Sequence, residues 1–282
     1  MSDRILVCPL DETLIARLHG HVLAVRVQDP NDVARARAMT ESRARLHCVI
    51  LDSAQPLASL PLEALTGVPL ALFSPTVGDL EELFPRLPAL RELRVQVYLP
   101  LSGSTTLRDA RILASLGVPA ALCWDAPNID WDGLEDLLAY AAFGKLPHAD
   151  IEPFSYVISS YSTRGLVDFG AVYFDEPARY LHVSREGKLA HTSADLREGR
   201  FFADGEALAD LPPVDRQEDA RDRTDHFFLD RDGCASCAGF RVCLGKFPGE
   251  REKSPGCGQL FSKLVDIAEG HSRKDTGGLW QP

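Results

Sequence analysis

The sequence predicts an α/β fold, with parallel strands in residues 1–158 followed by a loop-rich segment that carries clustered cysteines. Three observations support this prediction. Apolar, β-branched runs alternate with helical patterns over the first half of the chain. Four of the seven cysteines fall between residues 234 and 257. Hydrophobic residues make up 45% of the 282 positions, which is enough to build a sizeable core.

The alternation begins with a short strand expected at Ile5–Val7 and a helix at Glu12–Leu18. Six strand–helix units follow. Their strands are expected at Val22–Val27, Cys48–Leu51, Val68–Phe73, Leu93–Val97, Val118–Trp124 and Ile151–Val157. The helices between them are expected at Asn31–Arg45, Pro61–Leu65, Val77–Phe84, Thr106–Leu116 and Gly133–Phe143. This order predicts a parallel sheet or a partial (βα)6 barrel, since a full barrel needs eight units.

Turn-forming residues mark the ends of several of these elements. Pro61 can open the second helix, and Gly67 and Gly117 can end helices before the next strand. Beyond residue 159 the pattern changes to strand-like pieces at Leu166–Phe174 and Tyr180–Ser184, the second followed by a hairpin turn at residues 185–188. Residues 193–232 are acidic and polar, which is typical of a connection with one or two short helices.

The chain therefore divides into four expected parts. Residues 1–158 form the strand–helix part, and residues 159–232 form a β-hairpin and an acidic connection. Residues 233–270 form the cysteine segment, and residues 271–282 form a polar tail that we expect to be mobile.

The overall charge excludes some classes of function. The chain has 41 acidic and 30 basic side chains, which gives a formal net charge of −11. A nucleic-acid-binding protein needs clustered Lys and Arg, so we expect no nucleic-acid partner. No apolar run reaches transmembrane length and the first residues lack a signal-peptide pattern, so we expect a soluble, cytoplasmic protein with no membrane partner and with reduced thiols.

The cysteine segment carries the strongest chemical signal. Its cysteines follow the spacing Cys234-x2-Cys237-x5-Cys243-x13-Cys257. A C-x2-C turn can place two thiolates on one side of a tight loop, and the other two cysteines can close a four-sulfur site. Thiolates bind soft centres, so the spacing leaves zinc and a [4Fe–4S] cluster both open. Disulfides are not expected in a reducing compartment.

The residues that follow the motif predict a helix. Leu260, Phe261, Leu264, Val265 and Ala268 recur at helical spacing and would form one buried face. Cys257 would then lie near the N-terminus of this helix, where the helix dipole stabilises a thiolate. The three remaining cysteines, Cys8, Cys48 and Cys123, are widely spaced and are expected in the strand–helix part of the chain. Cys48 and Cys123 fall in expected strands, so we expect these two in the core.

The combination of βα units with a C-terminal cysteine segment resembles the radical SAM enzymes that carry a SPASM domain. Cys234, Cys237 and Cys243 match that family's C-x2-C-x5-C, and Cys257 matches its final cysteine. In the family these four positions bind an auxiliary [4Fe–4S] cluster. The resemblance therefore implies a partial (βα)6 barrel joined to a SPASM-like module with one such cluster.

The departures from the family pattern fall into two groups. Phe247 and Thr192 stand where ligands of the family's other auxiliary cluster are expected, and no cysteine lies 9–15 residues upstream of Gly187. The family's C-x3-C-x2-C, which binds the cluster that cleaves S-adenosylmethionine, is missing after Val22–Val27, and residues 51–57 do not carry its GGEP motif. The resemblance thus implies one auxiliary cluster and no radical SAM chemistry.

These inferences lead to a hypothesis of function. The chain would be a pseudoenzyme that binds one [4Fe–4S] cluster, or zinc, through Cys234, Cys237, Cys243 and Cys257. It would act as an accessory protein beside a radical SAM or other peptide or protein maturase, binding the substrate or the partner, or relaying electrons. The alternatives are an enzyme with different chemistry at the barrel mouth and a zinc-stabilised binding protein.

Overall fold

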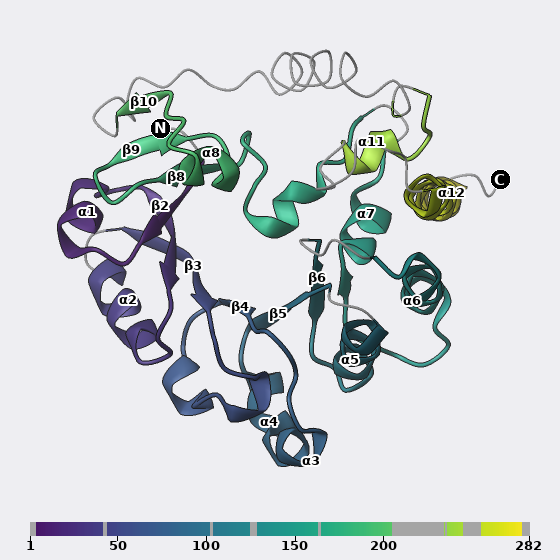
Figure 1. The fold of residues 1–282 in the computed structure, drawn as a ribbon, viewed down its shortest axis with the longest axis horizontal. Coiled ribbons are helices and arrows are strands. Elements are labelled where there is room, and N and C mark those ends of the chain that lie inside the picture. The colour runs from purple at the N-terminus through teal and green to yellow at the C-terminus, as the bar shows by residue number, and fades with distance from the viewer. Residues whose placement is uncertain are drawn as a thin grey trace. The chain divides into compact units, whose positions relative to one another are not determined.

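The computed structural model describes residues 4–41, 44–101, 104–124, 129–162, 165–204, 234, 236–244 and 255–277 (Figure 1). The chain forms two compact units, and each is built from two separate stretches of sequence. The first unit consists of Met1–Leu99 and Tyr173–Asp215. The second consists of Pro100–Val172 and Arg216–Pro282.

The first unit is built on a sheet with the strand order β10-β9-β8-β1-β2-β3-β4-β5. Strands β1 to β5 and β8 run parallel, while β9 and β10 extend the sheet as antiparallel strands. Their bounds are β1 Ile5–Pro9, β2 Val22–Val27, β3 Arg45–Asp52, β4 Leu70–Phe73, β5 Val95–Pro100, β8 Tyr180–Val183, β9 Lys188–Ala190 and β10 Ala203–Asp204.

Short helices connect the parallel strands of this unit. They are α1 Glu12–Arg17, α2 Asp32–Glu41, α3 Leu80–Leu83 and α4 Leu87–Glu92, with 3-10 turns η1 Leu57–Ser59, η2 Leu62–Leu65 and η3 Phe84–Arg86. Figure 1 shows α1 to α4 along one side of the strands. A further helix, α8 Ser193–Arg197, follows the β8–β9 hairpin.

The two faces of this sheet differ in composition. Strand register places apolar side chains on the face that includes Val25, Val49, Leu70 and Val95, and these are buried. The opposite face carries polar and aromatic side chains, among them Arg26, Asp52, Phe73, Tyr98 and His182. Side chains alternate between faces along a strand, so the sequence pattern alone determines this asymmetry.

The second unit pairs strands β6 Ala120–Cys123 and β7 Ile151–Glu152 in parallel and surrounds them with helices. The helices are α5 Ser104–Ser115, α6 Trp131–Phe143, α7 Phe154–Ser160, α11 Phe240–Cys243 and α12 Pro255–Gly277, and a 3-10 turn, η4, covers Phe169–Tyr173. Helix α12 contacts α6, α7 and α11. Figure 1 shows this helix in yellow-green beside α6 and α7.

The structure confirms the α/β class with mostly parallel strands and corrects two elements. Ile151–Val157 was expected to be one strand, but β7 ends at Glu152 and α7 begins at Phe154. The stretch Leu166–Phe174 was expected to be strand-like, but it contains η4 instead. In both places a short apolar run is compatible with either conformation, and local capping and packing decide between them.

The C-terminal helix is longer than the sequence pattern indicated. Helix α12 continues to Gly277, so residues 271–277, assigned to a mobile tail, are helical. Most of the expected acidic connection, residues 205–232, lies outside the described residues. Within the described part of the chain, no helix is both long and apolar enough to cross a membrane.

Candidate metal centre

Cys234 and Cys237 flank a tight turn, as the C-x2-C spacing predicts. The backbone N–H of Cys237 donates to the carbonyl oxygen of Cys234 at 3.1 Å. A second turn follows, because the N–H of Phe240 donates to the carbonyl of Cys237, also at 3.1 Å. Helix α11 follows at Phe240–Cys243, and its last residue, Cys243, is buried.

Cys257 lies in the first turn of α12, which confirms the expected position near a helix N-terminus. Its helix is fixed by the predicted apolar face, since Leu260, Phe261, Leu264 and Ala268 are fully buried. Cys257 lies at the N-terminal end of α12, and this end of a helix carries a partial positive charge that favours a thiolate. The sequence therefore placed Cys257 correctly with respect to this helix.

The thiols of the segment lie close enough to influence one another. Burial raises the pKa of Cys257 to about 11, and the neighbouring Cys237 and Cys234 add to this rise. Cys237 lies beside the same helix turn, because a β-carbon built on Gly258 would be 4.0 Å from its Sγ. All seven cysteines are free thiols, so no disulfide competes for these sulfurs.

Two glycines allow the elements that carry the cysteines to pack closely against their neighbours. A β-carbon on Gly239 would lie 2.3 Å from Cβ of Phe261, so the turn before α11 contacts the backbone of α12 directly. A β-carbon on Gly256 would lie 2.3 Å from the ring of Trp131 at the start of α6. Glycine is required at both places because any larger residue would collide with its neighbour.

A polar cluster fixes the same region from the other side. Arg241, which lies between Cys237 and Cys243, donates to the hydroxyl of Tyr161 at 3.3 Å. Tyr161 in turn donates to Glu269 of α12 at 2.9 Å. The cysteine segment is therefore packed into the second unit by contacts that need no metal.

The donor set has the right chemistry for a soft centre, but its sulfurs do not form a closed coordination sphere. Four free thiols in two short segments, one at a helix N-terminus, are suited to zinc or an iron–sulfur cluster. Among the described residues, however, no three His, Cys, Asp or Glu side chains converge closely enough to hold a metal ion together. Binding would therefore require the four thiols to move closer around the metal.

The other three cysteines differ in their surroundings. Cys8 and Cys48 are buried in β1 and β3 of the first unit, and burial raises the pKa of each to about 12. Cys123 ends β6 and is partly exposed. It belongs to the second unit, together with the four clustered cysteines, rather than to a separate part of the chain as expected.

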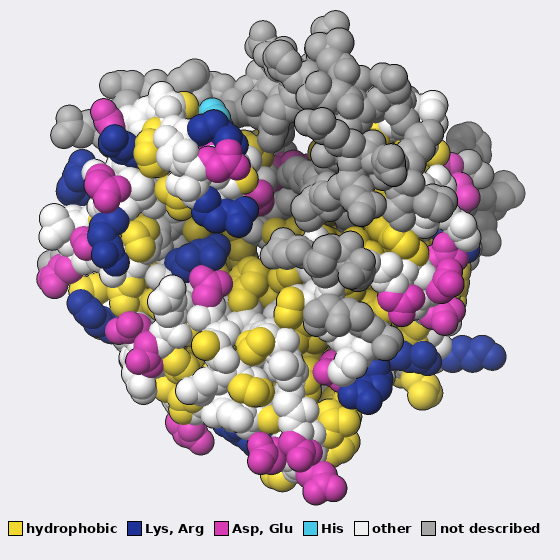
Figure 2. Space-filling model, viewed as in Figure 1, with side chains coloured by type: hydrophobic (Ala, Val, Ile, Leu, Met, Phe, Trp, Pro, Cys, Tyr) yellow, Lys and Arg dark blue, Asp and Glu magenta, His cyan; other side chains and the backbone are white. Residues whose placement is uncertain are grey.

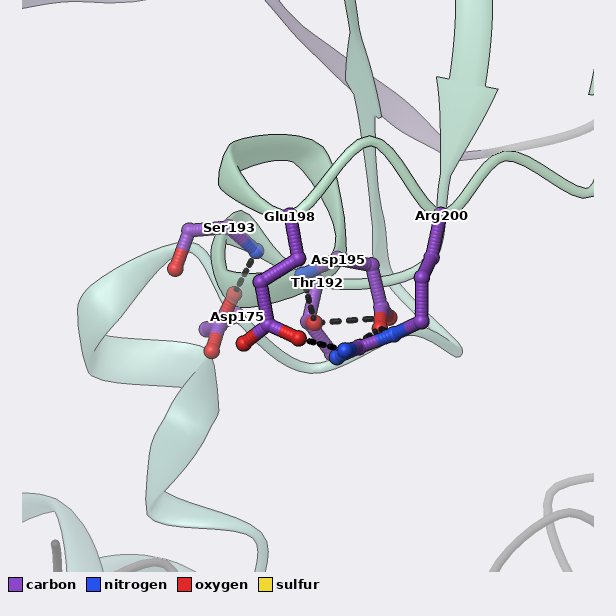
Figure 3. A network of polar contacts seen from close by, with 6 residues as sticks. All are labelled: Asp175, Thr192, Ser193, Asp195, Glu198 and Arg200. Atoms are coloured by element: carbon purple, nitrogen blue, oxygen red, sulfur yellow. Dashed lines mark hydrogen bonds and ion pairs between the residues drawn. The ribbon is translucent and has the colours of Figure 1, made fainter.

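Thr192, which stands where the radical SAM resemblance would place a cluster ligand, has a structural role. Thr192 caps α8: its hydroxyl accepts from the N–H of Asp195 at 3.0 Å and donates to that carboxylate at 2.7 Å. Figure 3 shows these contacts together with Arg200, which also binds Asp195. Asp175 accepts from the N–H of Ser193 at 2.7 Å beside them. The other expected position, Phe247, lies outside the described residues.

Sequence reasoning missed Tyr161, Arg241 and Glu269 as supports of the cysteine segment. Their contacts join residues 80 and 108 positions apart, which no local pattern reveals. The capping role of Thr192 did have a signal, because a Thr followed three residues later by an acid is typical of a helix start. No known protein family, no curated protein and no solved structure matches this chain.

Proposed function

We propose that this chain is a non-catalytic accessory protein that binds one [4Fe–4S] cluster through Cys234, Cys237, Cys243 and Cys257. The observation that carries the proposal is the meeting of the Cys234–Cys237 turn with Cys257 at the start of α12. Thiols gathered at a helix N-terminus, with no disulfide between them, are suited to metal ligation.

The proposed site is closed, with four protein ligands and no free position for a substrate. Closed thiolate sites serve structure or electron transfer rather than Lewis-acid chemistry. When bound, a cubane would supply a one-electron centre, and the chain's own residues would hold it.

The absence of catalysis is inferred from the ends of β2 and β3. In the radical SAM family that the sequence resembles, the cysteines that hold the catalytic cluster follow the first barrel strand. Here β2 is followed by residues 28–31 without a cysteine, and β3 ends at Asp52. The strand–helix part would then serve as a partial (βα)6 scaffold that presents the module to a peptide or protein maturase.

The loss of the second auxiliary cluster is part of the same proposal. Thr192 is occupied as a helix cap, and its region belongs to the first unit, whereas the four cysteines belong to the second. We therefore expect one centre, with about four irons and four sulfides per chain.

Metal analysis tests this proposal. The chain purified under anaerobic conditions should be brown and should contain about four irons and four sulfides after reconstitution. Iron and sulfide near eight per chain, on the order of two cubanes, would contradict the single-site assignment. A colourless protein with about one zinc per chain would instead identify a zinc-stabilised binding protein.

Partnership is tested separately from metal content. Co-expression with a radical SAM or other peptide maturase that is its partner should give a complex that survives gel filtration. If the isolated holoprotein instead converts a peptide on its own, the accessory assignment is wrong. That result would favour an enzyme with different chemistry at the mouth of the strand–helix part.

A further inference from the structure

The polar face of the first unit's sheet gathers charged and aromatic side chains at the carboxyl ends of its strands. Asp52 and Phe73 are register partners and close β3 and β4. Phe73 is in turn the partner of Tyr98 on β5. Arg26, near the end of β2, lies on the same face. Parallel sheets bind their ligands at the carboxyl ends of strands, so this row occupies the usual place for a site.

The charged part of this row is an exposed ion pair with unused hydrogen-bonding capacity. Nη1 of Arg26 donates to Oδ2 of Asp52 at 2.9 Å, and the two side chains are 40% and 31% exposed. This single bond leaves the second amino group and Nε of Arg26, and Oδ1 of Asp52, without a hydrogen bond to any described residue. The pair therefore offers donors for a carboxylate and an acceptor for an ammonium group.

The aromatic part lies next to the ion pair. The ring of Phe73 stacks on Tyr98 with centroids 4.3 Å apart and planes 14° apart. Tyr98 is buried while Phe73 is partly exposed, so one side of the stack faces outward. One strand spacing, about 4.8 Å, separates the backbone of Phe73 from that of Asp52. Figure 2 shows basic and acidic side chains beside hydrophobic ones over the region where β3 and β4 lie in Figure 1.

The aromatic stack is held in place by a residue in an unusual conformation. Phe174 has a φ of +60°, which is rare for a bulky side chain and persists only where surrounding contacts impose it. Its buried ring packs on Tyr98 and Tyr180 at 6.2 and 5.4 Å. Its carbonyl accepts from Nε2 of the buried His182 at 3.0 Å. Tyr98 is thus fixed on one side, and Phe73 on the other remains reachable.

We propose that the carboxyl ends of β2, β3 and β4 bind a free aromatic α-amino acid. Its carboxylate pairs with Arg26, its ammonium group pairs with Asp52, and its ring stacks on Phe73. A zwitterion fits better than an anion or a cation alone, because the site already contains one charge of each sign. The site is independent of the cysteine segment, since all its residues belong to the first unit.

Calorimetric titration with L-phenylalanine tests the proposal, with three matched probes. N-acetylphenylalanine keeps the carboxylate and loses the ammonium group, phenylalaninamide keeps the ammonium group and loses the carboxylate, and alanine loses the ring. We expect each probe to bind at least about tenfold more weakly than phenylalanine. The first two probes also represent the C-terminal and N-terminal residues of a peptide, so they distinguish a free amino acid from a peptide end.

Substitutions in the chain provide the second test. Arg26→Gln, Asp52→Asn and Phe73→Leu should each weaken phenylalanine binding by about tenfold or more. The controls are Arg35→Gln and Asp32→Asn, which alter an exposed pair on α2 whose charged atoms are 3.8 Å apart. These controls should bind as the parent chain does. Thermal melts of every variant establish that the chain is folded.

Three results would overturn the proposal. The first is no saturable heat with phenylalanine up to about 10 mM on the folded parent chain. The second is binding of N-acetylphenylalanine or of phenylalaninamide that is as tight as binding of phenylalanine. This would show that the site does not recognise the charged group that the probe lacks. The third is binding unchanged by both Arg26→Gln and Asp52→Asn. If Cys237→Ser loses metal and still binds phenylalanine, the result supports the amino-acid site and concerns only the cysteine segment.

Discussion

The hydroxyl of Tyr161 donates a 2.9 Å hydrogen bond to Oε1 of Glu269 and accepts one of 3.3 Å from Nη1 of Arg241. Tyr161 follows α7, Glu269 belongs to α12, and Arg241 belongs to α11. One partly buried hydroxyl therefore joins α11 and α12, which carry Cys243 and Cys257, to the end of α7. The guanidinium of Arg241 also lies 5.7 Å from the centre of the tyrosine ring.

Replacing Tyr161 with phenylalanine should destabilise the chain by about 1–3 kcal/mol, because it removes two hydrogen bonds and leaves a carboxylate without its donor. The measurement is urea denaturation of the metal-free chain. Tyr140→Phe is the matched control, since its hydroxyl bonds Ser115 at the exposed surface of the same unit. A loss no greater in Tyr161→Phe than in the control would show that the hydroxyl does not join these elements.

Gly239→Ala should also destabilise the chain, by about 1–3 kcal/mol. The added methyl would meet Cβ of Phe261 at 2.3 Å and the backbone of that residue at 3.1 Å, so the turn before α11 must shift away from α12. Gly258→Ala is the control, because its β-carbon would approach only the sulfur of Cys237, at 4.0 Å. Urea denaturation of both variants should separate them, and equal stability would contradict the close approach.

Glu152 should make stability depend on pH. Burial raises the pKa of its carboxyl to about 7, an effect that the charge of Asp150 increases and a hydrogen bond from the N–H of Tyr156 opposes. The folded chain therefore binds a proton more tightly than the unfolded chain does. Stability should fall as pH rises from about 4.5 to 7, by about 2–3 kcal/mol.

Glu152→Gln tests this dependence, because the amide keeps an oxygen that can accept from Tyr156 and carries no charge. The difference in unfolding free energy between the variant and the parent chain should grow from about pH 4.5 to pH 7, with the variant more stable at pH 7. Asp150→Asn should shift the parent's dependence to lower pH, since it removes a charge that raises the pKa of Glu152. Parallel pH profiles of the parent and Glu152→Gln chains would contradict the assignment.

Much of the fold could be predicted from the sequence because its signals are local. Strand β2 spans Val22–Val27, as the apolar run predicts. Gly67 and Gly117 have φ values of +83° and +78°, which few other residues adopt, and they precede β4, which begins at Leu70, and β6, which begins at Ala120. Gly187 has a φ of +88° in the β8–β9 turn. In each case one residue type or one period is sufficient to determine the local conformation.

Helix α7 shows where such reasoning fails. The run from Ile151 to Val157 is apolar and short enough for a strand. Pro153 and the carboxylate of Glu152, which accepts from the N–H of Tyr156, instead start a helix after two strand residues. Packing against α12, far along the chain, then stabilises that helix, and this contact has no local signal.

The candidate site was predictable to a similar extent. Spacing identified the four cysteines, and the structure brings the Cys234–Cys237 turn beside Cys257. Spacing did not show that α12 packs against α6 and α7, because these contacts join residues about a hundred positions apart or more. In the structure, α12 is packed through Phe261 and its apolar neighbours, as the helical spacing predicted.

This packing decides what removal of the metal should do. Cys237→Ser should lose the bound metal, because three thiolates and a hydroxyl form a poor site for a soft centre. Because Leu260, Phe261, Leu264 and Ala268 are buried without a metal, α12 should stay folded and only the turn around Cys237 should open.

Hydrogen exchange with and without metal measures this directly. Protection of the α12 amides beyond Phe261 should be equal in the parent and in Cys237→Ser, while the amides of Cys237 and Phe240 should exchange faster in the variant as their turns open. Cys123→Ser is the control, because it changes a thiol of the same unit outside the proposed ligand set and should retain the metal. Full metal content in Cys237→Ser would show that Cys237 is not a ligand. Loss of protection along all of α12 would show instead that the metal, rather than the apolar face, holds this helix in place.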